Sequence, residues 1–185
     1  RARMSRVIVL LRAVNVGAQR KVPMAELRAL AAGEGFADAE TYIQSGNLVL
    51  TAKKPVPAVV AALERAIECH FGFTVDVIAR TADQWDAYAA GSPFTDAQRE
   101  RPNHLLLGLA ARPLNEGVAE VLQARAKNGE RVEVVGDAIW VDYPNGGVAR
   151  SKLTPAAIDK AAGSPVTARN WNTVLKLHAM ARKTV

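Results

Sequence analysis

Hydrophobic positions in the first half of the chain follow two patterns, continuous apolar runs and helical spacing. The run RVIVLLRAV (6–14) is rich in β-branched residues, which predicts a central strand buried on both faces. Polar and glycine residues at 45–47 break the apolar stretch 39–52, so this stretch is expected to be a strand or a hairpin. The elements expected in this half are a strand over 6–14, a helix over 22–36, the strand or hairpin over 39–52, a helix over 56–70 and a strand over 73–81.

The second half nearly repeats this order of elements. The elements expected there are a strand over 103–111, a helix over 113–127, two short strands within 130–143 that turn at Gly136-Asp137, a short helix over 153–163 capped by Thr154, and a last helix over 170–183. The first half gives β-α-β-β-α-β if 39–52 is a hairpin, and the second half gives a diverged βαββα. The sequence therefore predicts an α+β fold of two intertwined ferredoxin-like (βαββαβ-type) subdomains.

Gly, Pro, Asp and Arg accumulate near residues 92–102, which indicates a boundary there. We expect a ferredoxin-like subdomain over 1–92 and a second α+β subdomain over 103–185. A C-terminal helix is expected to close the second subdomain and to pack back on the first. The two subdomains can also be counted as a single domain.

Composition limits the class of protein. Hydrophobic residues make up 49% of the chain and charged residues 23%, the balance of a globular protein, and no apolar run approaches the roughly 20 residues that span a bilayer. We therefore expect no membrane partner. Cys69 is the only cysteine, so no internal disulfide can form, and we expect a cytoplasmic protein.

Charge is distributed unevenly along the chain. Residues 1–28 and residues 150–185 each hold seven Lys or Arg and one acid, whereas residues 29–149 hold ten bases and sixteen acids. Each end thus carries +6 and the centre −6, for a total of +6. The basic ends would form one positive face if they meet in space; alternatively, they solvate separate surfaces.

Three blocks of polar residues interrupt the hydrophobic pattern. In the first, Arg12, Asn15 and Lys21 lie where the first strand gives way to a loop and then to the first helix, a common ligand position. An arginine can grip a carboxylate or phosphate with two hydrogen bonds, and a lysine adds a point charge. The stretch NVGAQRK is neither a Walker A motif nor a dinucleotide fingerprint, so the alternative is a structural role in which Arg12 pairs with a buried carboxylate or carbonyl and Asn15 makes an Asx turn.

In the second block, Gln44, Ser45 and Asn47 interrupt a strand. Ser45 lies in no nucleophile elbow, and the sequence offers no Asp–His pair, which argues against a serine hydrolase. A turn or bulge at Gly46 and Asn47 is expected instead.

The third block, TARNWNTVLKL (167–177), stands where the last helix begins. Thr167 or Asn170 can cap this helix, and Trp171 is expected to be a core anchor. We hypothesise that Arg169 and its neighbours Asn170 and Asn172 converge with Arg12 and Gln44 in one cleft. That cleft would either pin the last helix to the first subdomain or hold an anion.

Together the segments LLRAVNVGAQRKVPMAELRAL, TYIQSGNLVL and TARNWNTVLKL resemble, in this order, the bacterial family known as domain of unknown function 1697. The resemblance extends from about Val7 to Ala181. It implies an α+β protein of ferredoxin-like character and no assigned activity. Ala13 and Ala18 stand where the family often has glycine, which argues against close backbone approach to a ligand at these positions.

The three histidines, His70, His104 and His178, are scattered and have no H-x-x-H or C-x-x-C partner, so we expect no metal and no cofactor. Three functions remain open. The first is an anion-binding module for a phosphate-bearing ligand or a nucleic acid. The second is a small-molecule enzyme of unknown reaction with a polar site from the three blocks. The third is a structural or interaction protein without a ligand.

Overall fold

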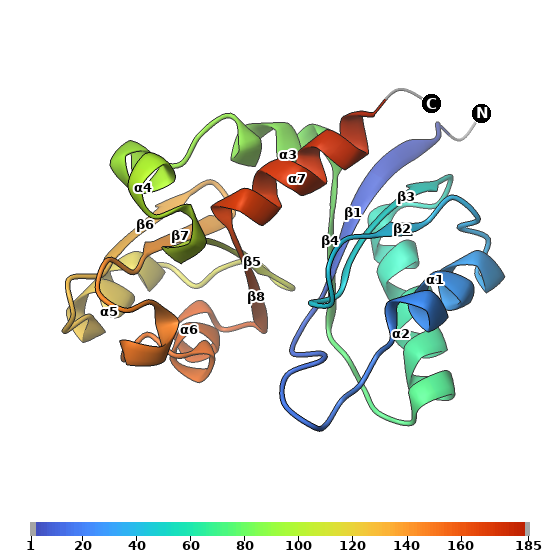
Figure 1. Cartoon of the computed structure of the whole chain (residues 1–185), viewed down its shortest axis with the longest axis horizontal. Coiled ribbons are helices and arrows are strands. Elements are labelled where there is room, and N and C mark those ends of the chain that lie inside the picture. The colour runs from blue at the N-terminus through green and yellow to red at the C-terminus, as the bar shows by residue number, and fades with distance from the viewer. Residues whose placement is uncertain (1–2, 184–185) are drawn as a thin grey trace. The chain divides into compact units, whose positions relative to one another are not determined.

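The computed structural model describes residues 3–183, and this part of the chain forms two compact units. Unit 1 comprises the chain up to Asp86 together with the stretch from Leu177 onward, and unit 2 comprises Ala87–Lys176. Two helices, α3 (Ala82–Ala89) and α7 (Trp171–Arg182), contain the points where the chain passes between the units (Figure 1). The domain ranges 1–92 and 103–185 stay a prediction.

Unit 1 contains a four-stranded antiparallel sheet in the order β2-β3-β1-β4. Its elements are β1 (Ser5–Leu11), α1 (Met24–Gly33), β2 (Glu40–Thr41), β3 (Asn47–Ala52), α2 (Val56–Phe71) and β4 (Val77–Thr81). The strand expected over 6–14 is β1, and residues Val7–Leu11 are fully buried between β3 and β4, as its continuous apolar run predicts. The stretch 39–52 is a hairpin, which confirms that alternative.

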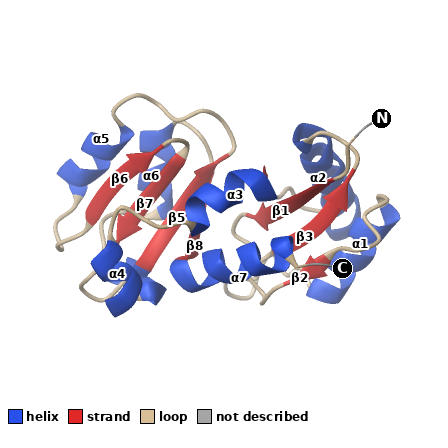
Figure 2. Ribbon diagram, turned by 90° about the horizontal axis from the view of Figure 1, so that it is seen from above, coloured by secondary structure: helices blue, strands red, loops and turns tan. Residues whose placement is uncertain are grey.

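Helices α1 and α2 cover one face of this sheet (Figure 2). The core of unit 1 lies between them and the strands, where Val9 and Leu48 of the sheet pack with Leu27 of α1 and Leu63 of α2. These side chains are all 0% exposed, so each contributes roughly 1.5–3 kcal/mol of hydrophobic stabilisation.

Unit 2 contains a second four-stranded antiparallel sheet, in the order β6-β7-β5-β8. Its elements are α4 (Thr95–Glu100), η1 (Pro102–His104), β5 (Leu105–Ala110), α5 (Val118–Arg125), β6 (Arg131–Val135), β7 (Ala138–Asp142), η2 (Val148–Arg150), α6 (Pro155–Ala162) and β8 (Val166–Asn170). Helices α5 and α6 pack on one face, where Leu122, Val141 and Leu153 form its core. The turn at Gly136-Asp137 and the Thr154 cap are confirmed.

The sequence prediction was wrong about one element of unit 2, because it assigned no final strand to the second half of the chain. Residues Val166–Asn170 form β8, which pairs with the central strand β5. Thr167 and Arg169 are buried on this strand, opposite Leu109 and Leu107. The segment is short and polar, so its strand conformation comes from pairing with β5 and not from a local apolar pattern.

Candidate functional site

The first polar block forms a loop whose shape is fixed by Asn15. Its side-chain oxygen accepts a hydrogen bond from the Val22 N–H at 2.8 Å, and its amide nitrogen donates to the Val22 carbonyl at 2.9 Å. The same amide nitrogen lies 2.6 Å from the carbonyl oxygen of Gln44. Asn15 therefore closes its own loop and ties it to the turn of the second block.

The second block is closed by Asn47, the first residue of β3. Its side chain is 0% exposed and donates to the Tyr42 carbonyl at 2.9 Å and to the Ser45 hydroxyl at 2.8 Å. Within the turn, the Tyr42 N–H donates to the Asn47 carbonyl at 3.1 Å. These contacts close the five residues between β2 and β3.

Backbone strain in the described residues is concentrated in these two loops. The non-glycine residues with positive φ are Ala13, Asn15 and Arg20 in the first loop and Ile43 in the second, with φ between 49° and 58°. Such a conformation is unfavourable for a residue with a Cβ and most unusual for β-branched isoleucine. Strain of this kind persists only where the surrounding contacts enforce it, and it is common at functional sites.

The two cations that the sequence predicts as site residues of the first block, Arg12 and Lys21, lie at opposite ends of this loop. Arg12 directly follows β1, is half-buried, and donates its backbone N–H to the Asp76 carbonyl at 3.0 Å. Lys21 is exposed and precedes buried Val22. The six predicted site residues of the first two blocks therefore belong to one hydrogen-bonded pair of loops in unit 1.

The third block lies in unit 2, at the junction of β8 and α7. Arg169 is 8% exposed and donates to the Thr167 hydroxyl at 2.7 Å and to the Ala168 carbonyl at 2.9 Å. Burial disfavours its charged form and lowers the pKa of the Arg169 guanidinium to about 10. Trp171 is buried against Trp140, as expected of a core anchor.

Two asparagines complete this junction. Asn170 accepts a hydrogen bond from the Thr173 N–H at 3.0 Å and so caps α7, whereas the other candidate cap, Thr167, lies within β8. The side chain of Asn172 donates to that of Asn103 at 2.8 Å. The proposed convergence of Arg169 with Arg12 stays a prediction.

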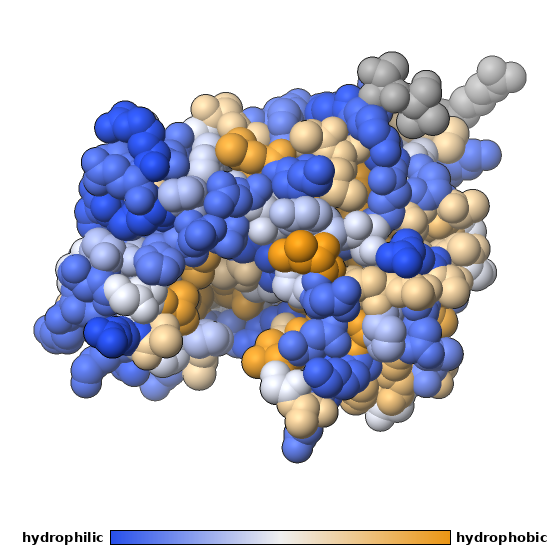
Figure 3. All heavy atoms as spheres, viewed as in Figure 1, coloured by the Kyte–Doolittle hydropathy of each residue, from blue (hydrophilic) through white to orange (hydrophobic). Residues whose placement is uncertain are grey.

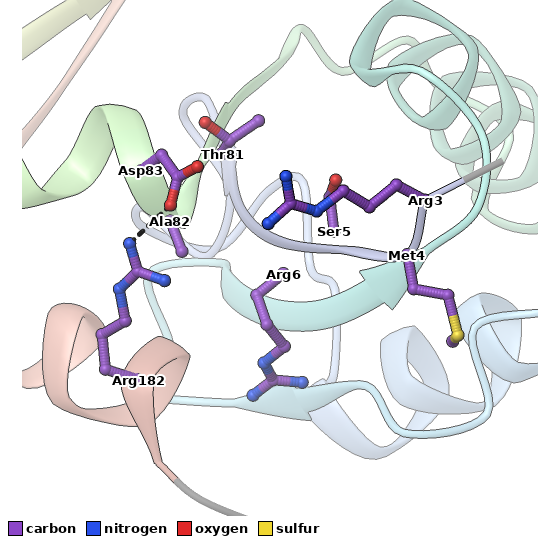
Figure 4. Close-up of a pocket in the computed structure, with 8 residues that line it drawn as sticks. All are labelled: Arg3, Met4, Ser5, Arg6, Thr81, Ala82, Asp83 and Arg182. Carbon is purple, nitrogen blue, oxygen red and sulfur yellow. Dashed lines mark hydrogen bonds and ion pairs between the residues drawn. The ribbon is translucent and has the colours of Figure 1, made fainter.

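A pocket of about 230 Å³ in unit 1 gathers residues from both basic ends of the chain. Arg3 and Arg6 come from the N-terminal end and Arg182 from the C-terminal end, and Thr81 and Asp83 complete this arginine pocket (Figure 4). Arg3 is exposed, and in Figure 4 its guanidinium points toward the side formed by Thr81. The lining thus holds three cations and one acid.

Arg6 is the structural anchor of this pocket. Its guanidinium donates to the carbonyls of Met180 and Ala181 in the last turn of α7, at 3.1 and 3.3 Å, where helical carbonyls have no partner within the helix. It also donates to Asp38 at 2.9 Å and to Thr51 at 3.2 Å. Burial alone would raise the pKa of Asp38, but the Thr51 hydrogen bonds and the Arg6 charge lower it.

Arg182 is held on the other side of the pocket by acids of α3. It donates to Asp83 at 2.7 Å, the contact drawn in Figure 4, and to Asp86. The hydrogen bond from Arg182, followed by that from His178, lowers the pKa of Asp86 to about 2. The Asp86 carboxylate is therefore ionised at neutral pH and keeps Arg182 in place.

Motif reasoning did not place these three arginines in a site. Arg3, Arg6 and Arg182 belong to no polar block, and the contacts of Arg6 with α7 join residues more than 170 positions apart. The signal that pointed to them was the excess of basic residues at both ends of the chain.

Two further features of residues 3–183 bear on the class of site. In this range no group of three or more His, Cys, Asp or Glu is arranged to hold a metal ion. No helix of the same range has the length and apolar character needed to cross a membrane.

Two antiparallel sheets, each with its own helices, define the chain as an α+β protein. It belongs to the family described as "Protein of unknown function (DUF1697)", whose model matches residues 4–140. The third polar block lies beyond the matched residues. The family relationship assigns no activity.

A solved structure has a similar fold. It is the conserved bacterial protein SP0830 from Streptococcus pneumoniae, with a TM-score of 0.72 and 22% sequence identity. The similarity covers 97% of this chain and 100% of that chain, and at this identity it concerns the fold alone. A comparison with curated proteins finds no match.

Proposed function

We propose that the protein binds a small phosphate-bearing anion in the arginine pocket of unit 1. The observation that carries this proposal is the meeting of basic residues from both ends of the chain around one cavity, Arg3 and Arg6 from one end and Arg182 from the other. Guanidinium groups suit phosphate because their planar N–H groups match its oxygens in pairs.

The arrangement is preorganised for an anion. Arg6 is fixed by two helix carbonyls and Asp38, and Arg182 is fixed by Asp83 and Asp86, so neither side chain must be ordered on binding. Arg3 is exposed and forms no ion pair with another described residue, so its charge is available to an anionic ligand. The three arginines outnumber the single acid in the lining.

The pocket favours a small ligand over stacked bases. The exposed large hydrophobic residues of the described chain are Met, Val, Ile and Leu, with no aromatic ring among them. Proteins that read single-stranded nucleic acids stack bases on exposed aromatic rings. Recognition in the arginine pocket therefore depends on the phosphate group.

The test is thermal unfolding with inorganic phosphate, pyrophosphate, nucleoside monophosphates and sugar phosphates. A ligand at 100 times its Kd stabilises the native state by about 2.7 kcal/mol, or roughly 5–10 °C in Tm for a protein of this size. Arg3→Ala should abolish most of this shift without lowering the basal Tm. The matched control is Arg65→Ala, an exposed arginine on α2. If no anion raises Tm, or if Arg3→Ala leaves the shift intact, the proposal is wrong.

A second candidate function is structural, and one observation favours it. Asn15 and Asn47 direct their side chains to the backbone of their own paired loops. The first two polar blocks would then serve to hold these loops together without any ligand. This function would be supported if no anion raises Tm in the screen and if Asn15→Ala lowers the stability of the protein.

We further propose that each unit is a ferredoxin-like subdomain. The support is the element order β-α-β-β-α-β in both halves and the matching sheet orders β2-β3-β1-β4 and β6-β7-β5-β8. A cytoplasmic location remains part of the proposal because Cys69 is the only cysteine. Cell fractionation followed by detection of the native protein tests the location.

A further inference from the structure

The loop between β7 and α6 of unit 2 (residues 143–154) is held in one shape by side chains beneath it. Asn128 donates to the carbonyls of Asn145 and Arg150 at 2.8 and 3.2 Å, and Asn145 donates back to the Asn128 carbonyl at 3.0 Å. At the start of the loop, the Tyr143 hydroxyl donates to the Leu153 carbonyl at 3.1 Å. The loop is therefore held by three hydrogen bonds with Asn128 and by one hydrogen bond within the loop itself.

Glu130 ties the same two segments together from the interior. It is 3% exposed and accepts hydrogen bonds from the Asn128 N–H and the Ser151 hydroxyl. Burial alone would raise the pKa of Glu130, but these hydrogen bonds lower it. Its carboxylate accepts hydrogen bonds from neutral donors and forms no ion pair with another described residue.

The loop also fixes one of its cations. Gly146 has φ +88°, and a Cβ placed there would lie 2.5 Å from Cδ of Arg150. The aliphatic part of the Arg150 side chain therefore lies directly against the Gly146 backbone. A side chain at position 146 would displace it, so this glycine serves the placement of the arginine.

Four cations gather at this loop. Arg125 is the last residue of α5 and Lys127 lies two positions beyond it, whereas Arg150 and Lys152 belong to the loop itself. The Arg125 Nε donates to the Lys152 carbonyl at 2.7 Å, which brings the two segments together. All four side chains are exposed, and none forms an ion pair with another described residue. We name Arg125, Lys127, Arg150 and Lys152 the basic loop surface.

We propose that the basic loop surface binds the phosphate backbone of a nucleic acid, independently of base sequence. Four exposed and unpaired cations on an ordered support suit a partner that presents several phosphates in a row. A polyanion releases its bound counterions on such a surface, and this release drives the association. Contact with the phosphate backbone of a nucleic acid needs no exposed aromatic ring, and the exposed large hydrophobic residues of the described chain include none.

Unit 2 presents a polar surface in one view. Figure 3 shows hydrophilic side chains gathered over the part of the visible face where Figure 1 draws α4, β6 and α5. The proposal concerns unit 2 alone and is independent of the arginine pocket, which lies in unit 1.

The test measures the affinity for fluorescently labelled DNA duplexes of two unrelated sequences by anisotropy at several salt concentrations. Four phosphate contacts predict a slope of about −3.6 in log K against log[salt], so raising salt from 50 to 200 mM weakens binding roughly 150-fold. In Lys127→Ala/Lys152→Ala the slope should fall to about −1.8, and the same change in salt should weaken binding only roughly 12-fold. The two sequences should bind equally.

Controls separate this surface from other sources of charge. Arg65→Ala, in unit 1 and outside the arginine pocket, should keep the wild-type slope, and all variants should keep the wild-type Tm. The proposal is wrong if wild-type protein fails to bind either duplex at 50 mM salt. It is equally wrong if the double variant keeps the wild-type slope, or if Arg3→Ala abolishes binding. The last result would assign the anion site to the arginine pocket alone.

Discussion

Asp142, the last residue of β7, is the most heavily hydrogen-bonded carboxylate of unit 2. It is 0% exposed. Arg101 donates to its two oxygens from Nε and Nη2, both at 2.7 Å, and Arg131 donates from Nε and Nη2 at 2.9 and 2.8 Å. Phe94 lies 4.6 Å from the Arg131 guanidinium. Asp142 thus joins β6, β7 and the segment before β5.

The informative perturbation is Asp142→Asn, which keeps the shape of the side chain and removes its charge. Two guanidiniums would then face a neutral amide whose nitrogen cannot accept their hydrogen bonds. Breaking a buried ion pair by neutralising one partner costs about 3–5 kcal/mol. Asp96 still pairs with Arg131 at 2.9 Å and with Arg101 at 3.3 Å, so we expect the lower end, about 3 kcal/mol.

The assay is urea unfolding followed by tryptophan fluorescence, with the free energy of unfolding extrapolated to water. The matched control is Asp96→Asn, because Asp96 contacts the same two arginines but has a side chain that is 43% exposed. Asp96→Asn should lower the free energy of unfolding clearly less than Asp142→Asn, since solvent screens an exposed ion pair. Equal losses in the two variants, or a loss below about 1 kcal/mol in Asp142→Asn, would refute the assignment of stability to burial.

The pH dependence gives a second readout of the same carboxylate. Burial alone would raise the pKa of Asp142, but the hydrogen bonds from Arg101 and Arg131 and their charges lower it. A folded-state pKa below the unfolded value of about 3.9 means that the stabilisation is complete above that value and is lost as pH falls through the folded pKa. Stability of the wild type should therefore fall more steeply below about pH 4 than that of Asp142→Asn.

Three further predictions concern the paired loops of unit 1. Ala13→Gly should raise the free energy of unfolding by about 0.5–1 kcal/mol, because it relieves a positive φ of 56° at the cost of some backbone entropy; chemical unfolding measures the gain. Asn15→Ala should lower it by about 2–3 kcal/mol, because the buried Val22 N–H and carbonyl lose their partner, and a proteolysis assay should find the loop more readily cleaved. Gly46→Ala should lower Tm far more than Gly17→Ala. Both glycines have positive φ, but of the two only Gly46 would place a Cβ within 3.0 Å of neighbouring side chains. Equal Tm values for the two variants would contradict the packing argument.

The hydrophobic pattern was sufficient to predict most of the elements. The apolar run at 6–14 marked β1, and the polar interruption at 45–47 marked the turn before β3. In contrast, β8 could not be found from its own residues. Thr167 and Arg169 look like solvent-exposed positions, yet pairing with β5 places both in the interior.

The candidate pocket was beyond the reach of local motifs. Charge counting left two alternatives for the basic chain ends, one shared positive face or separate solvated surfaces, and it could not say which side chains meet. That depends on the hydrogen bonds of Arg6 to the carbonyls of Met180 and Ala181, which link opposite ends of the sequence. The strain at Ala13 likewise has no local signature, since alanine ordinarily avoids positive φ.

The discontinuity of unit 1 has a consequence for how the protein is made. Residues Ala87–Lys176 lie in sequence between its two parts, so about 90 residues must be synthesised after β1, β3 and β4 before Leu177 emerges from the ribosome. At 5–20 residues per second this delay is roughly 5–20 s, far longer than an elementary folding event. During that interval Arg6 lacks the carbonyls of α7. The first unit to begin folding is therefore the last to be completed, and its nascent form is the one that chaperones would meet.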